Sequence, residues 1–267
     1  MIRKPVVNGT FYPANKKDID DLIESYTPTK STKISAKGLI LPHAGYIYSG
    51  KVATATVSHT LPKKRIIILG PNHKGIGNNF SLWNKGCWTI PYGKINIDEE
   101  LAAAILANGD IIKSDNSAHI EEHSIEAELP ILYYFFENFK FVPISCKYSS
   151  LNNYEYVANQ IYKAIKNISD EILLIASSDL THYEPDASAR KKDREIIDSI
   201  INLDEKSMLQ KIDKFNISMC GAAPVAILIS CLKKIKATKS QVIMYQTSGD
   251  ASGDYNSVVG YLGALIS

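Results

Sequence analysis

The chain has 267 residues, of which 45% are apolar and 22% charged, a composition typical of a globular protein and not of a disordered one. Its 30 Lys and Arg residues nearly balance its 28 Asp and Glu residues, so the net charge of +2 gives no sign of nucleic-acid or anionic-membrane binding. No apolar run approaches the roughly 18 residues of a membrane span, and the N-terminus lacks an apolar signal segment. Four scattered cysteines without a CxxC pair predict a reduced, cytoplasmic protein.

The sequence shows no linker, charge block or internal repeat, so we expect one domain over residues 1–267. Short, β-branched apolar segments predict strands at Gly38–Leu41, Arg65–Leu69, Phe139–Ile144, Ile172–Ala176, Gln241–Tyr245 and Val258–Leu265. Longer amphipathic segments predict helices at Lys17–Tyr26, Lys51–His59, Asp98–Ala107, Tyr154–Ile168, Ala187–Ile201 and Ala223–Ile235. This alternation predicts an α/β fold with a mainly parallel central sheet and helices on both faces. Lys74–Pro91, which holds both tryptophans, is expected to be a long surface excursion.

Polar segments follow three of the predicted strands, and each contains a histidine. Gly38–Leu41 leads into Pro42-His43-Ala44-Gly45-Tyr46, and Arg65–Leu69 leads into Gly70-Pro71-Asn72-His73. Ile172–Ala176 leads into Ser177-Ser178-Asp179-Leu180-Thr181-His182-Tyr183. Ligands of open α/β sheets bind at the carboxyl ends of the strands, so we expect these segments to meet at one site.

Each candidate residue could have a functional role or a purely structural one. His43 lies between a proline and Ala-Gly, where a core histidine has little to pack against, which favours a functional role. His73 is either functional or a turn histidine bonded to its own backbone. Asp179 and His182, three residues apart on one expected loop, either share the site or include a helix cap at Asp179.

His123 lies among carboxylates in Glu121-Glu122-His123-Ser124-Ile125-Glu126, at the start of an apolar segment. It is either a site residue or a solvated histidine beside an N-cap at Ser124. His59 and His119 have no comparable context, and we expect both at the surface.

Cys220 precedes Gly221-Ala222-Ala223-Pro224, a tight turn that opens a helix, and helix N-termini stabilise thiolates. Cys231 lies on the apolar face of that helix and is expected in the core, while Cys87 and Cys146 are expected to be structural. Two histidines and a cysteine suit Fe(II), Cu or Zn and are poor ligands for Mg or Ca.

Several motifs together resemble one family, the Memo family, which is component B of the AmmeMemoRadiSam system. The matching segments, in chain order, are Gly9–Pro13 (GTFYP), Pro42–Tyr46 (PHAGY) with Tyr48–Gly50 (YSG), Gly70–His73 (GPNH), Glu122–Glu126 (EHSIE) with Leu129-Pro130, Ser177–Tyr183 (SSDLTHY), Cys220-Gly221 with Pro224, Thr247–Asp250 (TSGD) and Val258–Tyr261 (VVGY). They extend over nearly the whole chain.

The resemblance implies a fold similar to that of the class III extradiol dioxygenases of the LigB type, which are non-haem iron enzymes. It places His43, His73 and Cys220 at the metal-ligand positions and His182 at the position of the acid/base histidine. Asp179 and His123 are then expected to line the same pocket. The dioxygenases use a carboxylate where this chain has Cys220, so ring cleavage does not carry over. The family name also implies a functional link to AMMECR1-like and radical-SAM proteins.

Two functions from different classes follow. The first is a metal-dependent oxidoreductase with a mononuclear centre, for which we expect iron, that acts on a small substrate while His182 moves protons. The second is a non-catalytic module that binds a peptide or a small anionic ligand in the same cleft. A Cys220–His hydrolase is less favoured because the sequence has no nucleophile elbow.

Overall fold

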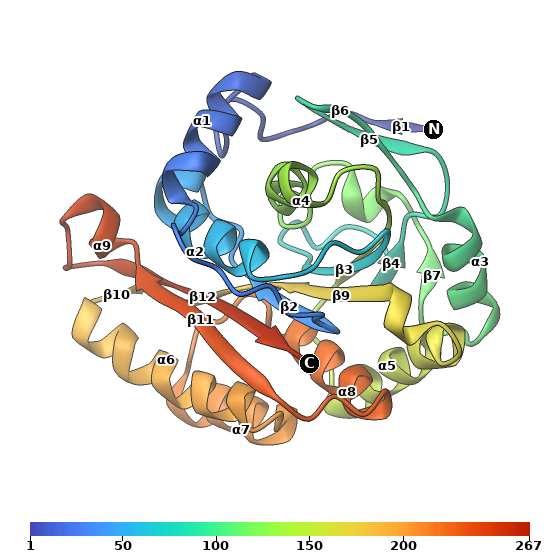
Figure 1. Ribbon diagram of the computed structural model, residues 1–267. Helices are drawn as coiled ribbons and strands as arrows, with labels where there is room; N and C mark the ends of the chain where they lie inside the picture. Colours follow the sequence, from blue (N-terminus) through green and yellow to red (C-terminus); the bar gives the residue numbers. More distant parts are fainter.

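The main sheet has nine strands, and its centre is parallel (Figure 1). The computed structural model describes residues 1–267, with the exception of the Asp170 side chain. The four central strands, in spatial order, are β2 (Gly38–Leu41), β9 (Ile172–Ser177), β3 (Arg65–Pro71) and β8 (Lys140–Cys146). Nearly every residue in them is buried, as expected where helices cover both faces of a parallel sheet.

Antiparallel pairing extends the sheet on both sides of this centre. On one side, β12 (Val258–Ile266) pairs with β2, β10 (Asp179–Glu184) and β11 (Ser240–Thr247). On the other, β4 (Phe80–Leu82) pairs antiparallel with β8 and parallel with β7 (Lys113–Ser114). A separate small sheet comprises β1 (Ile2–Arg3), β5 (Cys87–Ile90) and β6 (Gly93–Asn96). The α/β fold is confirmed, and the parallel character resides in the centre of a mixed sheet.

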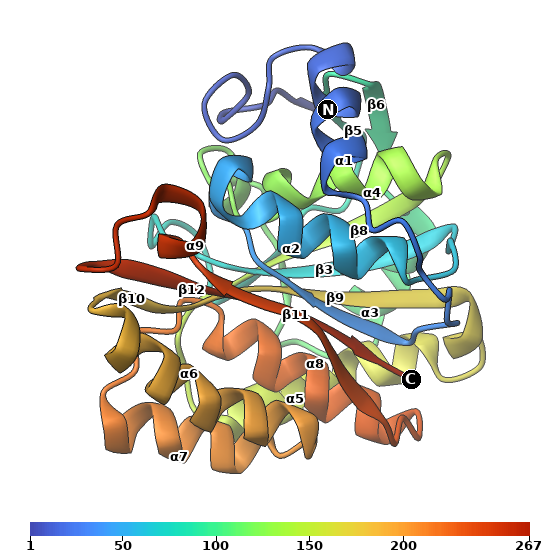
Figure 2. The same cartoon turned by 60° about the vertical axis from the view of Figure 1, so that its left-hand side comes forward.

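Helices cover the sheet in two layers (Figures 1 and 2). One layer has α1 (Lys16–Tyr26), α2 (Tyr46–Ser58) and α4 (Leu129–Phe136). The other has α3 (Glu99–Ala107), α5 (Leu151–Ile165), α6 (Asp186–Ile201), α7 (Glu205–Phe215) and α8 (Ala222–Lys234). The short α9 (Gly249–Ser252) follows β11, and 3-10 turns occupy Ser117–His119, Glu126–Glu128 and Ser169–Glu171. Within the described part of the chain, no helix has both the length and the hydropathy needed to cross a bilayer.

Strand β3 shows why the central strands are apolar without interruption. Its successive side chains point to opposite faces, so Ile66 and Ile68 join the core under α1, α2 and α4. Ile67 and Leu69 join the core under α5 and α8. Each strand therefore needs an apolar residue at nearly every position.

The predicted strands and helices all occur, with ends that shift by a few residues. Helices α4, α7 and α9 were not predicted. The expected surface excursion over Lys74–Pro91 is wrong, because this segment contains strands β4 and β5. Its Trp83 and Trp88 side chains are buried, and Trp88 packs edge-on against Phe141 of β8.

The expectation for His119 is also wrong. Its side chain is fully buried between the two tryptophan rings, and its Nε2 lies 2.9 Å from the carbonyl oxygen of Ser81. His59 is half-buried at the end of α2, where its Nδ1 lies 2.7 Å from the carbonyl oxygen of Ala55. The tryptophans supply the apolar surroundings of His119, and they are distant from it in sequence.

Candidate metal centre

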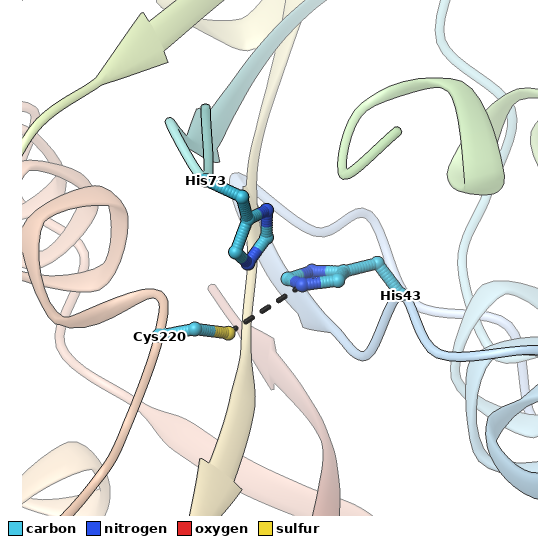
Figure 3. A group of neighbouring side chains, drawn as sticks. All are labelled: His43, His73 and Cys220. Carbon is cyan, nitrogen blue, oxygen red and sulfur yellow. Dashed lines mark hydrogen bonds between the residues drawn. The ribbon is translucent and has the colours of Figure 1, made fainter. Parts of the chain in front are cut away.

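The carboxyl ends of the parallel strands bring two predicted ligands together. His43 follows β2 and His73 follows β3, and their ring centroids are 5.3 Å apart. Cys220, directly before the turn into α8, completes the group, with its Sγ 3.4 Å from Nε2 of His43 (Figure 3). One ligand atom from each residue lies within 4.8 Å of the others. Two ligands of one first-row metal ion are at most about 4.6 Å apart, so small movements would close this group around an ion.

Each histidine is oriented by a buried polar group on its far side. Nδ1 of His43 lies 2.8 Å from Oγ of Ser177, and Nδ1 of His73 lies 2.8 Å from Oε1 of Glu122. Both rings therefore leave Nε2 facing Cys220. Histidines that bind metals commonly donate the other ring N–H to a protein acceptor in this way.

Glu122 is the stronger of these two anchors. Its carboxylate accepts hydrogen bonds from the backbone N–H groups of His73, His123 and Ser124 as well as from the His73 ring. Burial alone would raise the pKa of Glu122, but the hydrogen bonds and the charge of the His73 ring lower it to about 2. Glu122 was not predicted as a site residue, although its place directly before His123 was a usable signal.

Ser177 links His43 to a buried acid. Its Oγ lies 2.8 Å from the carbonyl oxygen of Ser124 and 2.8 Å from Oε1 of Glu128. Burial raises the pKa of Glu128 well above its ordinary value. Neither Ser177 nor Glu128 was predicted, because only the tertiary structure brings the turn at Glu126–Glu128 against the end of β9.

Cys220 depends on the glycine that follows it. A side chain at Gly221 would collide with Ser178 and with the carbonyl oxygen of Ser177, so only glycine lets this turn approach β9 so closely. The expected lowering of the thiol pKa is not found. Burial and the nearby Asp179 carboxylate raise the pKa of Cys220 well above its ordinary value in the absence of a cation. A bound metal ion would reverse this, because a coordinating thiol is deprotonated.

The three residues predicted to act on substrate surround this group. His123 stacks on His73 with a centroid distance of 4.8 Å, and Phe11 meets its edge at 4.8 Å. Oδ1 of Asp179 accepts a hydrogen bond of 2.9 Å from the backbone N–H of His43. Burial raises the pKa of Asp179 to about 6, against the opposing effect of His182.

His182 lies near the site but not on the loop that was expected. It belongs to β10, where it pairs with Val259 of β12 across an irregular register. Its Nδ1 faces the carbonyl oxygens of Leu180 and Ser218 at 2.7 and 2.8 Å, so Nε2 is left for other partners. Asp179, His182 and Cys220 form a further group with ligand atoms within 4.8 Å, as do His73, Glu122 and His123.

A cavity of about 660 Å³ opens over these residues, a size typical of small-molecule sites. Its described lining contains no Lys or Arg. Besides the histidines and Asp179, it includes four aromatic side chains and a polar loop after β11: Phe11, Tyr48, Tyr183, Tyr261, Ser248, Ser252, Asp254 and Ser257. Several of these residues belong to motifs noted in the sequence, but none was predicted as a site residue.

The donor set fits a transition metal. Imidazole and thiolate are borderline or soft ligands that suit Fe, Cu and Zn, whereas Mg and Ca need oxygen donors. The His43, His73 and Cys220 group therefore could hold a metal ion of this kind.

Comparisons with known proteins cover the whole chain. The family model described as "Memo-like protein" matches residues 3–265. A MEMO1 family protein of Methanopyrus kandleri is 38% identical, covering 98% of this chain and 97% of its own length. A MEMO1 family protein of Sulfolobus acidocaldarius is 39% identical, with 98% of each chain covered.

Among solved structures, an uncharacterized protein from Escherichia coli K12 superimposes with a TM-score of 0.57 at 13% identity. The match covers 84% of this chain and 98% of that protein, and it shows a shared fold. The family model and the relatives together show that this chain belongs to the Memo family.

Proposed function

We propose that His43, His73 and Cys220 hold one transition-metal ion, Fe(II), and that the cavity above carries redox or dioxygenase-like chemistry on a small substrate. One observation carries the proposal: both imidazoles turn Nε2 toward Cys220 while protein groups engage each Nδ1. The same donors suit Cu and Zn, and the resemblance to extradiol dioxygenases favours iron. A thiolate ligand requires reducing conditions, which supports a cytoplasmic location, and the four cysteines are unpaired.

The surrounding residues have distinct parts in this proposal. A bound ion would supply Lewis acidity and a redox centre. His182 exchanges a proton with the substrate at Nε2, since its Nδ1 is engaged by backbone carbonyl oxygens. Asp179, whose pKa burial raises to about 6, holds or releases a proton near neutral pH. His123, stacked on His73, orients the substrate.

Cys220 separates this chemistry from ring cleavage. The extradiol dioxygenases that the sequence resembles have a carboxylate in this position, and a thiolate donates more electron density to the ion. The thiolate therefore lowers the Lewis acidity of the bound ion and changes its redox potential. We therefore propose redox chemistry without assigning the cleaved bond.

Binding without turnover is the alternative, with a peptide or a small anion as the ligand. Because no Lys or Arg is among the described lining residues, an anion would find no cationic side chain in this cavity. Four histidines and an aspartate in the cavity lining, beside one thiol, also exceed what a peptide groove needs. A functional link to AMMECR1-like and radical-SAM proteins stays a prediction.

The test is metal content together with oxygen consumption. The protein is purified anaerobically, reconstituted with Fe(II) and examined by elemental analysis and spectroscopy. We expect one ion per chain, with loss of the ion in His43→Ala and Cys220→Ser. Cys146→Ser is the matched control, because Cys146 is buried at the end of β8 outside the group, and it should keep the ion. A wild-type protein that binds no Fe, Cu or Zn, or a Cys220→Ser variant that binds as wild type does, would contradict the proposal.

A further inference from the structure

Strand β11 (Ser240–Thr247) forms an open edge of the main sheet. Of the described strands it pairs with β12 alone, whose other side is occupied by β10 and β2. Helices α2 and α6 pack on its two faces (Figure 2). Among the described residues, no backbone group of Gln241–Gln246 bonds to an element other than β12, and none of these residues is fully buried. The backbone along this edge is therefore free to pair with a further strand.

Val242 and Tyr245 direct their backbone groups toward this open edge. Before β11, Lys239 exchanges two backbone hydrogen bonds with the residue after β12, and beyond the other end the N–H of Ser248 donates to a carbonyl oxygen of β12. Hydrogen-bonded and non-hydrogen-bonded positions alternate along an antiparallel ladder. Counted from each end, Val242 and Tyr245 occupy non-hydrogen-bonded positions, so their N–H and C=O groups face away from β12. The register shift between these two positions accounts for their spacing along the strand.

The side chains of the same two residues lie on one face of the sheet. Val242 and Tyr245 both pack against the core under α5 and α8, whereas Ile243 packs against the other core. The Tyr245 hydroxyl donates a hydrogen bond of 2.7 Å to Oδ2 of Asp193 on α6, which holds the ring in place. In an antiparallel pair of two β11 strands, Val242 of each copy can lie opposite Tyr245 of the other. A β-branched residue opposite an aromatic one is a favourable cross-strand pair.

The charges at the ends of β11 favour this antiparallel arrangement. The strand itself has no Lys, Arg, Asp, Glu or Pro, although charged residues and proline are what commonly prevents an edge strand from pairing. Exposed Lys236 and Lys239 precede it, and exposed Asp250 and Asp254 follow it. Asp250 is bound by Arg190, whereas the two lysines and Asp254 form no ion pair within the described part of the chain. Antiparallel pairing of two copies places the basic end of each strand beside the acidic end of the other, so β11 is complementary to itself.

We propose that β11 is a dimer interface, at which two copies of this chain pair antiparallel about a twofold axis between Ile243 and Met244. The two main sheets then form one continuous sheet, and each copy contributes the same residues, as a twofold contact requires. Gln241 of each copy lies opposite Gln246 of the other on the α2 face, because Val242 and Tyr245 occupy the opposite face. This inference goes beyond the proposed function and does not require a metal ion.

The first test is the oligomeric state of the full chain. Sedimentation velocity is measured over about a hundredfold range of concentration, because a dimer gains population as the chain concentration rises. We expect a species with twice the mass of one chain at the highest concentration. A protein that stays monomeric over the whole range overturns the proposal.

Charge variants test the pairing of the two strands. Gln241→Lys combined with Gln246→Lys places like charges opposite each other and should weaken the dimer at least tenfold. Gln241→Lys combined with Gln246→Glu makes the same pairs attractive and should restore the wild-type dissociation constant or lower it. Gln210→Lys combined with Asn152→Lys is the matched control, because it adds the same charge at exposed positions of α7 and α5, and it should leave the dimer unchanged. A lysine–glutamate variant as weak as the double-lysine variant, or an equal loss in the control, overturns the pairing.

Hydrogen exchange locates the interface. The amides of Val242 and Tyr245 should exchange at least tenfold more slowly in the dimer than in the monomer, because each N–H gains a carbonyl partner. The amides of β7 (Lys113–Ser114), at the other edge of the main sheet, are the control and should exchange equally in both states. Mass spectrometry of peptides that cover the two strands measures this. A dimer whose β11 amides exchange as they do in the monomer overturns the assignment of β11 as the interface.

Discussion

The burial of His119 makes the stability of this protein depend on pH in a defined way. Its imidazole is enclosed by Trp83 and Trp88, with centroid distances of 6.2 and 5.7 Å, and it is fully shielded from solvent. Burial lowers the pKa of His119 from 6.5 to about 4, and the nearby Arg3 guanidinium adds to this effect. The hydrogen bond with the Ser81 carbonyl acts in the opposite direction and is outweighed.

The sign follows from proton binding in the two states. Between pH 6.5 and pH 4 the unfolded chain binds a proton at His119 that the native state does not, so the free energy of unfolding falls as the pH falls. The difference between the pKa values of His119 in the unfolded and native states corresponds to about 3 kcal/mol of unfolding free energy, at about 1.4 kcal/mol per pKa unit. Domains are typically stable by about 5–15 kcal/mol, so the loss is measurable.

The test compares wild type with His119→Gln, whose amide can still donate to the Ser81 carbonyl but does not titrate. Urea unfolding of the metal-free proteins is measured from pH 8 to pH 4. The variant should be less stable than wild type at pH 8, because it loses the packing of the imidazole between the tryptophans. The difference between the two free energies of unfolding should be about 3 kcal/mol smaller at pH 4 than at pH 8. A His119→Gln curve parallel to that of wild type over this range would refute the reasoning.

Three further predictions concern the candidate centre. His182→Ala should keep the Fe(II) affinity within about tenfold of the wild-type value, while turnover or ligand binding falls. Complete loss of metal, measured by elemental analysis, would instead make His182 a ligand. Cys220 is partly exposed and the other three cysteines are buried, so it should alkylate first in metal-free protein even though its thiol pKa is raised, and it should be protected when metal is bound. Mass spectrometry with and without a chelator measures this, and a lack of chelator dependence in metal-loaded protein argues against the His–His–Cys group. Ser177→Ala removes the partner of the His43 ring and should lower metal affinity about 10–100-fold in a competition titration, whereas unchanged affinity would show that the ring needs no such partner.

The local pattern of residues was enough to place much of the candidate site. Central strands such as β3 are covered on both faces, so their apolar runs are continuous and easy to recognise. The polar segments after them contain His43 and His73, and parallel strands deliver their carboxyl ends to one edge of the sheet. Proximity of the two histidines therefore followed from the sequence and one rule of α/β folds.

Other features depended on contacts between distant segments. His182 follows a strand as predicted, but its segment forms β10 because β12 supplies an antiparallel partner there. Glu128 and Tyr261 became recognisable as site residues only when packing brought them to Ser177 and to the cavity.

The sequence by itself determined the α/β class, the family and the residue types of the candidate centre, because apolar periodicity and short motifs are properties of neighbouring residues. Only the tertiary structure decided which nitrogen of each histidine faces Cys220, since Ser177 and Glu122 engage the other nitrogen from remote parts of the chain. It also decided that His119 is enclosed and that the cavity has no cationic side chain in its described lining. Burial and electrostatic environment are sums over neighbours in space, and a sequence read along the chain does not contain those neighbours.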